Sequence, residues 1–256
     1  MKHSLQAAAC FLGLVLLAGC GSTAATQSTN TKTATTTSSC TNGSAASSNT
    51  LTVAEEPSSG VDSPTASCWS DITGTPETIA DTGTLPSGDS VSFKVAWNTS
   101  NLYILADVTA WPIYNAADDA AGDWWESDTT EYGVSGLDTH AGPYSSGPTY
   151  QFAVAGATGI LYTTGQNASN ASPLPKAMND IVQGKGFSTE LIVPWQTLEV
   201  TKPASGQSYQ FDIAQDFGNS AGQRLAQVDW QAIPSDFGTS QDWHVDTADW
   251  GTITLG

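Results

Sequence analysis

The sequence predicts an all-β fold, an antiparallel β-sandwich with jelly-roll or immunoglobulin-like topology. Over many short stretches, apolar side chains alternate with polar ones, which is the pattern of a strand that buries one face. Residues that favour turns separate these stretches, and no stretch keeps a helical period for more than two turns. Short strands joined by turns are typical of two antiparallel sheets packed face to face.

The clearest element of this fold is a predicted β-hairpin. Apolar residues occupy alternate positions from Val91 to Trp97, and the alternation continues from Leu102 to Val108. Residues 98–101, with the sequence Asn-Thr-Ser-Asn, favour a turn between the two strands. We therefore expect a hairpin with one buried face.

Shorter stretches of the same kind follow along the chain. Pro194 is expected to end one of them, because proline cannot donate a ladder hydrogen bond. The further predicted strands cover residues 131–134, 149–155, 159–163, 186–193, 209–215, 224–230 and 250–255.

The first nineteen residues predict an export signal. The apolar run from Leu5 to Leu17 is too short to cross a bilayer as a helix. Residues 17–20, Leu-Ala-Gly-Cys, resemble the lipobox of bacterial lipoproteins, which implies that residues 1–19 are removed and that Cys20 is lipidated. Several acyl chains would then hold the protein to a membrane. Because Gly21 follows the cysteine instead of aspartate, the outer membrane or cell surface is the expected location.

Residues 20–50 are predicted to be a flexible tether that follows the lipidated cysteine. Ser and Thr dominate this segment and aliphatic side chains are scarce, so no core can form there. A flexible chain of about 30 residues has an average reach on the order of 30 Å. Residues 51–256 are expected to form one folded domain.

Composition limits the partners of that domain. The chain carries a formal net charge of -18 at pH 7. Such a surface repels phosphate backbones and anionic lipid, so we expect no nucleic-acid partner and contact with membrane only through the lipid anchor. Calcium and neutral sugars are compatible with this charge.

The four cysteines also fit an exported protein. Cys10 would leave with the signal and Cys20 would carry lipid, so Cys40 and Cys68 are the pair that could form a disulfide in an oxidising compartment. Two free thiols are the alternative. The absence of Cys-x-x-Cys spacing excludes the usual zinc and iron–sulfur motifs.

The segment that looks most like a binding site covers residues 123–134. Two adjacent tryptophans, Trp124 and Trp125, lead into a run of carboxylates and hydroxyls. Sugars stack their C–H faces on indole rings while their hydroxyls bond to polar groups, so this combination favours sugar binding. Because neighbouring side chains in an extended segment face opposite ways, one indole is expected in the core and the other in the site.

The order of motifs resembles carbohydrate-binding module family 9, a β-sandwich of the wider DOMON-like group, over most of residues 51–256. The resemblance rests on several short pieces in the same order and spacing, of which the run Trp125-Glu126-Ser127-Asp128-Thr129-Thr130-Glu131 is one. The other pieces are residues 61–62, 69, 95–98, 101–104, 150–152, 190–195, 228–230 and 243–255. The resemblance implies a β-sandwich that binds carbohydrate without catalysis.

The resemblance also implies how the sugar is held. Modules of this family clamp a sugar unit between two tryptophans, which correspond here to Trp125 and Trp243. Asp128 and Glu131 would accept hydrogen bonds from hydroxyls, and Gln151 could donate and accept. An alternative role for the two acids is to organise their loop or to bind a structural calcium ion.

Further candidates lie in the same long segment. Trp111, next to Pro112, is a candidate lining residue of the site. Family modules also bind calcium, and hard oxygen ligands are available in this segment. The calcium candidates are Asp107, Asp118, Asp119 and Asp123.

The chain departs from the family in one respect that bears on specificity. The strand with Gln151 can carry an arginine in the family, but the nearby residue here is Ala153. Arg224 is the only arginine of the domain. The preference of the family for reducing ends of glucan or xylan chains is therefore not carried over.

Two other function classes remain alternatives, beside a plain adhesion role. A haem-binding electron-transfer domain would need axial ligands from Met178, expected in a loop, His140 and His244, and we expect no haem. A glycosidase would need a carboxylate pair such as Asp128 and Glu131, yet residues three apart in a strand face opposite ways. The leading prediction is a sugar-binding surface lipoprotein whose partner enzyme the sequence does not identify.

Overall fold

The computed structural model describes residues 49–56, 61, 63–115, 123–139, 144, 147–239 and 242–256. All of them belong to one compact unit, residues 37–256. Within the described ranges the chain consists of β-strands, loops and short 3-10 turns, so the predicted all-β class is confirmed. The segments 1–19 and 20–48, with the predicted signal and most of the tether, lie outside the described residues.

The strands have the following bounds: β1 (Thr50–Glu55), β2 (Thr75–Pro76), β3 (Ile79–Gly83), β4 (Ser90–Trp97), β5 (Asn101–Thr109), β6 (Thr129–Ser135), β7 (Thr149–Ala155), β8 (Leu161–Tyr162), β9 (Lys176–Val182), β10 (Gly186–Pro194), β11 (Ser208–Phe217), β12 (Ala226–Asp229) and β13 (Gly251–Leu255). The 3-10 turns are η1 (Ser67–Asp71), η3 (Trp124–Glu126), η4 (Ala168–Asn170) and η5 (Pro234–Asp236).

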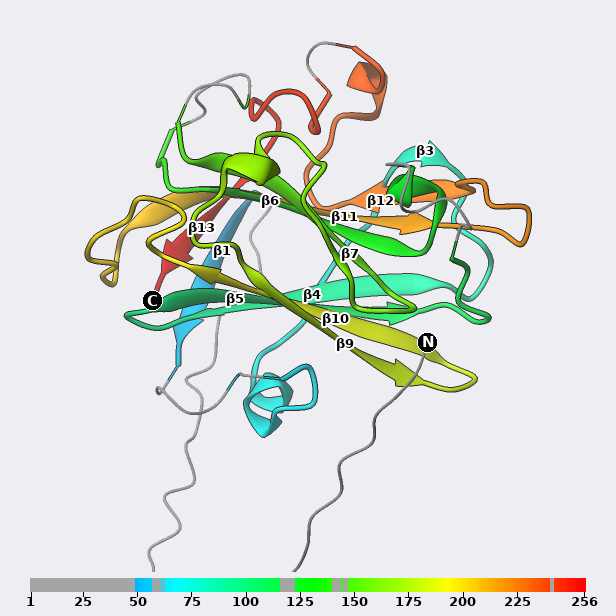
Figure 1. Ribbon diagram of the computed structural model, residues 1–256, viewed down its shortest axis with the longest axis horizontal. Coiled ribbons are helices and arrows are strands. Elements are labelled where there is room, and N and C mark those ends of the chain that lie inside the picture. Colours follow the sequence, from blue (N-terminus) through cyan, green and yellow to red (C-terminus); the bar gives the residue numbers. More distant parts are fainter. Residues whose placement is uncertain are drawn as a thin grey trace, which may run out of the picture. The chain divides into compact units, whose positions relative to one another are not determined.

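Hydrogen bonds join the strands in the order β8-β7-β6-β11-β13-β1-β4-β5-β10-β9, and β12 pairs with β11 and β3. Figure 1 shows two layers, with β6, β7 and β11 above β4, β5 and β10. Strand β1 connects the layers because it pairs in parallel with both β13 and β4. The strands therefore form one continuous hydrogen-bonded sheet, and its division into the two separate sheets of a sandwich stays a prediction.

The predicted hairpin is confirmed as β4 and β5, which pair in antiparallel register with Trp97 opposite Leu102. The turn is fixed by Asn98, whose Oδ1 accepts hydrogen bonds from the backbone N–H groups of Ser100 at 2.8 Å and Asn101 at 2.9 Å. An asparagine side chain that bonds its own turn in this way is the expected local signal. The hairpin builds half of the lower layer in Figure 1.

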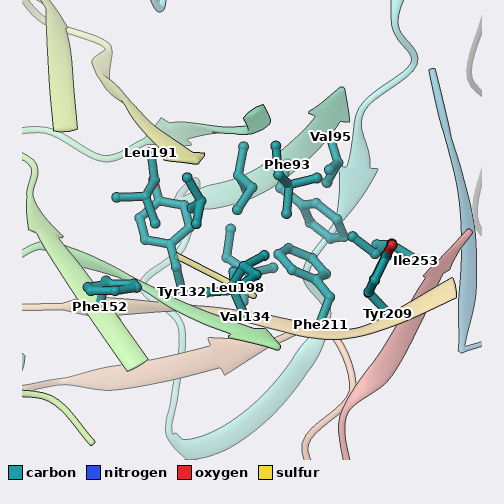
Figure 2. Close-up of a cluster of buried hydrophobic side chains, with 14 of the residues drawn as sticks. Phe93, Val95, Tyr132, Val134, Phe152, Leu191, Leu198, Tyr209, Phe211 and Ile253 are labelled. Carbon is teal, nitrogen blue, oxygen red and sulfur yellow. The ribbon is translucent and has the colours of Figure 1, made fainter. Parts of the chain in front are cut away.

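The main core fills the space between the two layers. Figure 2 shows Phe93 from β4 and Phe211 from β11 facing each other, and their ring centroids lie 5.6 Å apart. Tyr132 from β6 crosses to β10, where its hydroxyl lies 2.8 Å from Oγ1 of Thr189. Alternate residues of each strand thus supply the core, as the sequence pattern predicted.

Four strands were not predicted from the sequence, namely β1, β2, β3 and β9. Met178 was expected in a loop, but it lies in β9, pairs with Glu190 of β10 and packs against a second apolar cluster that contains Trp69. Strand β9 lies at an edge of the sheet, and its residues are half-buried or exposed on both faces, so its sequence shows little alternation.

Cys68 lies in η1, is buried and is disulfide-bonded. Its partner lies outside the described residues, as do Cys20 and Cys40, so the pairing with Cys40 stays a prediction. In the described ranges, no helix is both long enough and apolar enough to serve as a membrane span.

Candidate functional site

A cavity of about 320 Å³ opens at one end of the β6, β7 and β12 strands. It is lined by side chains from five separate segments, which the fold brings together. The lining residues are Trp124, Trp125, Glu131, Gln151, Thr164, Gly165, Gln166, Arg224, Gln227 and His244. Three of the predicted site residues, Trp125, Glu131 and Gln151, therefore line one cavity.

The tryptophan pair forms the aromatic wall of this cavity. Trp124 is 4% exposed and Trp125 is 37% exposed, so one indole is in the core and the other is accessible, although both lie in the 3-10 turn η3 and not in the extended segment that was expected. The Trp124 Nε1–H donates to Thr164 Oγ1 at 3.0 Å, and its ring stacks on Tyr162 with a centroid separation of 6.3 Å. The ring of Trp125 stands edge-on to that of Trp124 at 5.4 Å, so a fixed indole supports the exposed one.

Glu131 is the centre of the polar wall. It is 2% exposed and accepts hydrogen bonds from Gln151 Nε2 at 2.5 Å and from Gln227 Nε2 at 3.0 Å. The backbone N–H of Gln166 in turn donates to Gln151 Oε1 at 3.1 Å. Each amide group keeps a second N–H for a further acceptor. This network fixes the directions in which a ligand hydroxyl can bond.

A buried charge pair lies behind the polar wall. The Arg224 guanidinium contacts the carboxylate of Asp216 at 3.0 Å. Burial raises the pKa of Glu131 well above its ordinary value, and the nearby charge of Asp216 raises it further. Burial also raises the pKa of Asp216, but Arg224 opposes that rise. Arg224 therefore keeps Asp216 the more acidic of the two groups, and a proton binds Glu131 more readily.

His244 contributes from the C-terminal segment. Its Nδ1 lies 2.5 Å from Oδ1 of the buried Asp242. Although burial alone would raise the pKa of Asp242, the hydrogen bond from His244 lowers it. Because Nδ1 is engaged by the carboxylate, Nε2 is the ring nitrogen that can meet a ligand.

Trp243, the predicted second wall of a clamp, does not line the cavity. The residue is 1% exposed and packs with Tyr144, Trp250 and two alanines. Its carbonyl accepts hydrogen bonds from the Trp250 indole at 2.9 Å and from the Tyr144 hydroxyl at 3.3 Å. His244 faces the cavity in its place. Adjacent side chains face different ways, and the bulky indole occupies the interior.

Asp128 and Trp111 lie elsewhere. The Asp128 carboxylate is 2% exposed and accepts hydrogen bonds from the backbone N–H groups of Tyr114 at 2.6 Å and Gly218 at 2.8 Å. Despite these bonds, burial raises the pKa of Asp128 to about 6. Asp128 organises the loop, as the alternative reading of this acid proposed. With Trp111 it lines a second cavity, separate from the one at Trp125.

Sequence reasoning missed the contributions of Arg224, Gln227 and His244. Gln227 belongs to a stretch that was predicted as a strand. Because neighbouring residues of a strand face opposite ways, Gln227 and the buried Val228 lie on different faces of β12. Arg224 lines the cavity from a segment far from Gln151 in the sequence. Its status as the only arginine of the domain was the available signal.

The calcium candidates do not gather into a site among the described residues. Asp107 is paired with Lys94 at 3.3 Å and accepts a hydrogen bond from Ser188 at 2.7 Å. Asp123 precedes η3, and Asp118 and Asp119 lie outside the described ranges. In the part of the chain that the structure describes, no three Asp, Glu, His or Cys side chains could hold a metal ion.

Comparison with known proteins supports a common family for most of the chain. The family model described as "Carbohydrate family 9 binding domain-like" matches residues 61–256. Endo-1,4-beta-xylanase A of Thermotoga neapolitana is 26% identical over 173 residues, which are 68% of this chain and 15% of the xylanase. The chain thus spans only a small part of that relative.

Solved structures share the fold. A carbohydrate-binding module of family 9 from Caldicellulosiruptor kristjanssonii in complex with cellotriose aligns with a TM-score of 0.64 and 18% identity, over 80% of this chain and 93% of that one. A structure described as the same module with glucose aligns with a TM-score of 0.64 and 17% identity, over 81% and 95% of the chains. A putative carbohydrate-binding protein from Bacteroides uniformis aligns with a TM-score of 0.58 and 15% identity, over 82% and 100%.

Proposed function

Since the chain belongs to the carbohydrate family 9 binding domain-like family, we propose that it binds one unit of a neutral oligo- or polysaccharide in the cavity at Trp125. The observation that carries this proposal is an exposed indole set beside a buried network of amide and carboxyl groups. Family 9 modules that share the fold are known with cellotriose and with glucose, which supports a sugar as the ligand.

In the proposed complex, a pyranose ring stacks on the exposed face of Trp125. Aromatic faces favour the C–H groups of a sugar ring, and the apolar contact adds affinity without charge. The second N–H groups of Gln151 and Gln227 donate to ring hydroxyls, and His244 Nε2 completes the polar contacts. Arg224, held by Asp216 and lying 5.6 Å from the ring of Phe237, is oriented before the sugar arrives.

The two-tryptophan clamp implied by the family resemblance is a finer form of this proposal. It requires the indole of Trp243, now 1% exposed, to leave its packing with Tyr144 and Trp250. The observed arrangement supports a version in which Trp125 alone stacks and Trp243 supports the segment that carries His244. The two versions differ in the loss of sugar affinity that they predict when Trp243 is substituted.

We propose a binding role without catalysis. The carboxylates considered as a catalytic pair, Asp128 and Glu131, line different cavities and cannot act on one glycosidic bond. The buried Asp216 is engaged by Arg224, which disfavours its use as a base. The matched family is described as a binding domain, which agrees with this role.

We also propose that the binding domain is exported and tethered to a membrane through lipidated Cys20, and that the segment with Asp118, Asp119 and Asp123 binds calcium. A Ser- and Thr-rich tether of about 30 residues would let the domain reach polysaccharide beyond the membrane. Incorporation of labelled fatty acid by the wild type but not by Cys20→Ala is the expected result, and label in the variant would refute the anchor.

The proposed function predicts a saturable response to sugar. Titration of the purified protein with glucose, cellobiose, xylobiose and laminaribiose should change its tryptophan fluorescence, because the Trp125 indole exchanges water for a sugar face. A parallel assay for released reducing ends should stay at background. A response to none of the four sugars would reject the proposal, and product release would favour the glycosidase alternative.

A further inference from the structure

The second cavity, which we call the Trp111 groove, is similar in size to the first. It has a volume of about 270 Å³ and is lined mainly by Pro86, Ser87, Asp89, Trp111, Tyr114 and Leu225. Trp111 is 48% exposed and Leu225 is 44% exposed, so this groove presents two large apolar side chains to solvent. Large apolar side chains exposed beside polar groups mark a surface that binds something.

The groove is held in a defined shape. Its floor is Asp128, which accepts from the N–H groups of Tyr114 and Gly218, while the Asp128 N–H donates to the Tyr114 carbonyl at 2.8 Å. At the other end of the Trp111 segment, the Ala110 N–H donates to the Lys185 carbonyl at 3.0 Å. The segment that carries Trp111 is thus tied at both ends, which limits the entropy lost when a ligand binds.

The chemistry of the groove favours a neutral, hydroxyl-rich ligand. An indole offers a flat apolar face, and Ser87, Asp89 and the Tyr114 hydroxyl offer hydrogen-bonding groups at its rim. Among the described residues that line the groove there is no Lys, Arg or His, although Arg224 and His244 line the Trp125 cavity. With Asp89 at its edge and a strongly acidic chain around it, the groove repels phosphates and carboxylates.

Neighbouring residues of the same chain segments line the two cavities. Arg224 lines the Trp125 cavity, and the next residue, Leu225, lines the Trp111 groove. In the same way, Trp125 and Asp128 are three residues apart and line different cavities. A saccharide long enough to reach both cavities would meet an exposed indole in each, Trp125 in one and Trp111 in the other.

We propose that the Trp111 groove is a second saccharide site, which holds another sugar unit of the polysaccharide bound at Trp125. This inference rests on the proposed function, because its ligand is the same class of sugar. Two weak sites on one carrier raise retention on a polymer by avidity, with no change in affinity for a short sugar. The groove would thereby make a single domain bind polysaccharide more tightly than its disaccharide unit.

The test compares a short and a long ligand. Calorimetry measures the dissociation constant for the disaccharide that binds the wild type best, and affinity electrophoresis measures retention by the matching polysaccharide. Trp111→Ala should keep the disaccharide constant within about twofold and weaken polysaccharide binding by about tenfold or more. Asp89→Ala should likewise weaken polysaccharide binding more than disaccharide binding. Agreement between the two variants guards against a local folding defect in Trp111→Ala. Ile160→Ala, an exposed apolar residue outside both cavities, is the matched control and should change neither value.

Polysaccharide retention by Trp111→Ala equal to that of the wild type would overturn the second site. Loss of disaccharide binding in Trp111→Ala would also overturn it, because Trp111 would then serve the first cavity. Failure of the underlying function has a different signature, since the wild type itself would bind neither disaccharide nor polysaccharide.

Discussion

Trp125→Ala is expected to weaken sugar binding by about 30-fold or more, because loss of an exposed aromatic anchor costs about 2 kcal/mol or more at a binding site. The Trp125 indole is 37% exposed and is the aromatic surface that the cavity offers to a ligand. Since Trp124 keeps its hydrogen bond to Thr164, the variant should retain the fold. Calorimetric titration with the best-binding disaccharide measures the loss.

Trp243→Phe is the matched control for this variant. Phenylalanine keeps most of the buried volume and removes the indole Nε1–H, which has no hydrogen-bond partner among the described residues. The affinity should then stay within about threefold of wild type, since 0.6 kcal/mol or less corresponds to that factor. A loss as large as that of Trp125→Ala would mean that Trp243 stacks on the sugar, as the clamp requires.

The second large effect concerns pH and stability. Glu77, Asp212 and Asp229 are fully buried, and burial raises the pKa of each well above its ordinary value. Their mutual repulsion adds to the effect of burial, because Asp212 raises the pKa values of both Glu77 and Asp229. In the part of the chain that the structure describes, both carboxyl oxygens of Glu77 and of Asp229 lack a hydrogen-bond partner.

The direction of the pH dependence follows from these raised pKa values. Above about pH 4, the carboxyl groups ionise in the unfolded chain but keep their protons in the folded one. The folded state then binds more protons, so the free energy of unfolding falls as pH rises. Asp81, whose pKa burial raises to about 6, contributes to the same fall between about pH 4 and 6. We expect greater stability at pH 5 than at pH 8.

Asp229→Asn should reduce this pH dependence, because an amide cannot ionise. At pH 8 the variant should be more stable than wild type by on the order of 1–3 kcal/mol, because each pH unit over which one carboxyl group ionises only in the unfolded chain costs the wild type about 1.4 kcal/mol. At pH 5 the difference should be small. Asp138→Asn, which removes the same charge from an exposed position, should leave the slope almost unchanged. Urea unfolding at both pH values checks the prediction, and equal slopes in wild type and Asp229→Asn would contradict it.

The sequence predicted the strands in which apolar and polar residues alternate over the whole strand. The β4–β5 hairpin is an example, because alternation and the Asn98 turn are both read over a few residues. Strand β1 was missed because its parallel pairing with β13 and β4 depends on segments about 200 and about 40 positions away. Strand β9 was missed because an edge strand carries a weak pattern.

The site was predictable where one strand fixed the direction of its side chains. Glu131 on β6 and Gln151 on β7 face the same cavity because their strands are neighbours, and Ala153 stands directly opposite Glu131. The sequence did not predict that His244 rather than Trp243 lines the cavity. The packing of Trp243 with Tyr144 and Trp250 places its indole in the core. Arg224 reaches the cavity from a segment that no local motif connects with Trp125.

The most direct test of the account is the nuclear magnetic resonance of the tryptophan indole N–H groups during titration with the best-binding disaccharide. The chain has nine tryptophans, and single Trp→Phe variants assign the signals of interest. We expect the largest shift at Trp125, a smaller one at the adjoining Trp124 and little change at Trp243. A largest shift at Trp243, or no indole shift at saturating sugar, would contradict the proposal that Trp125 provides the stacking surface.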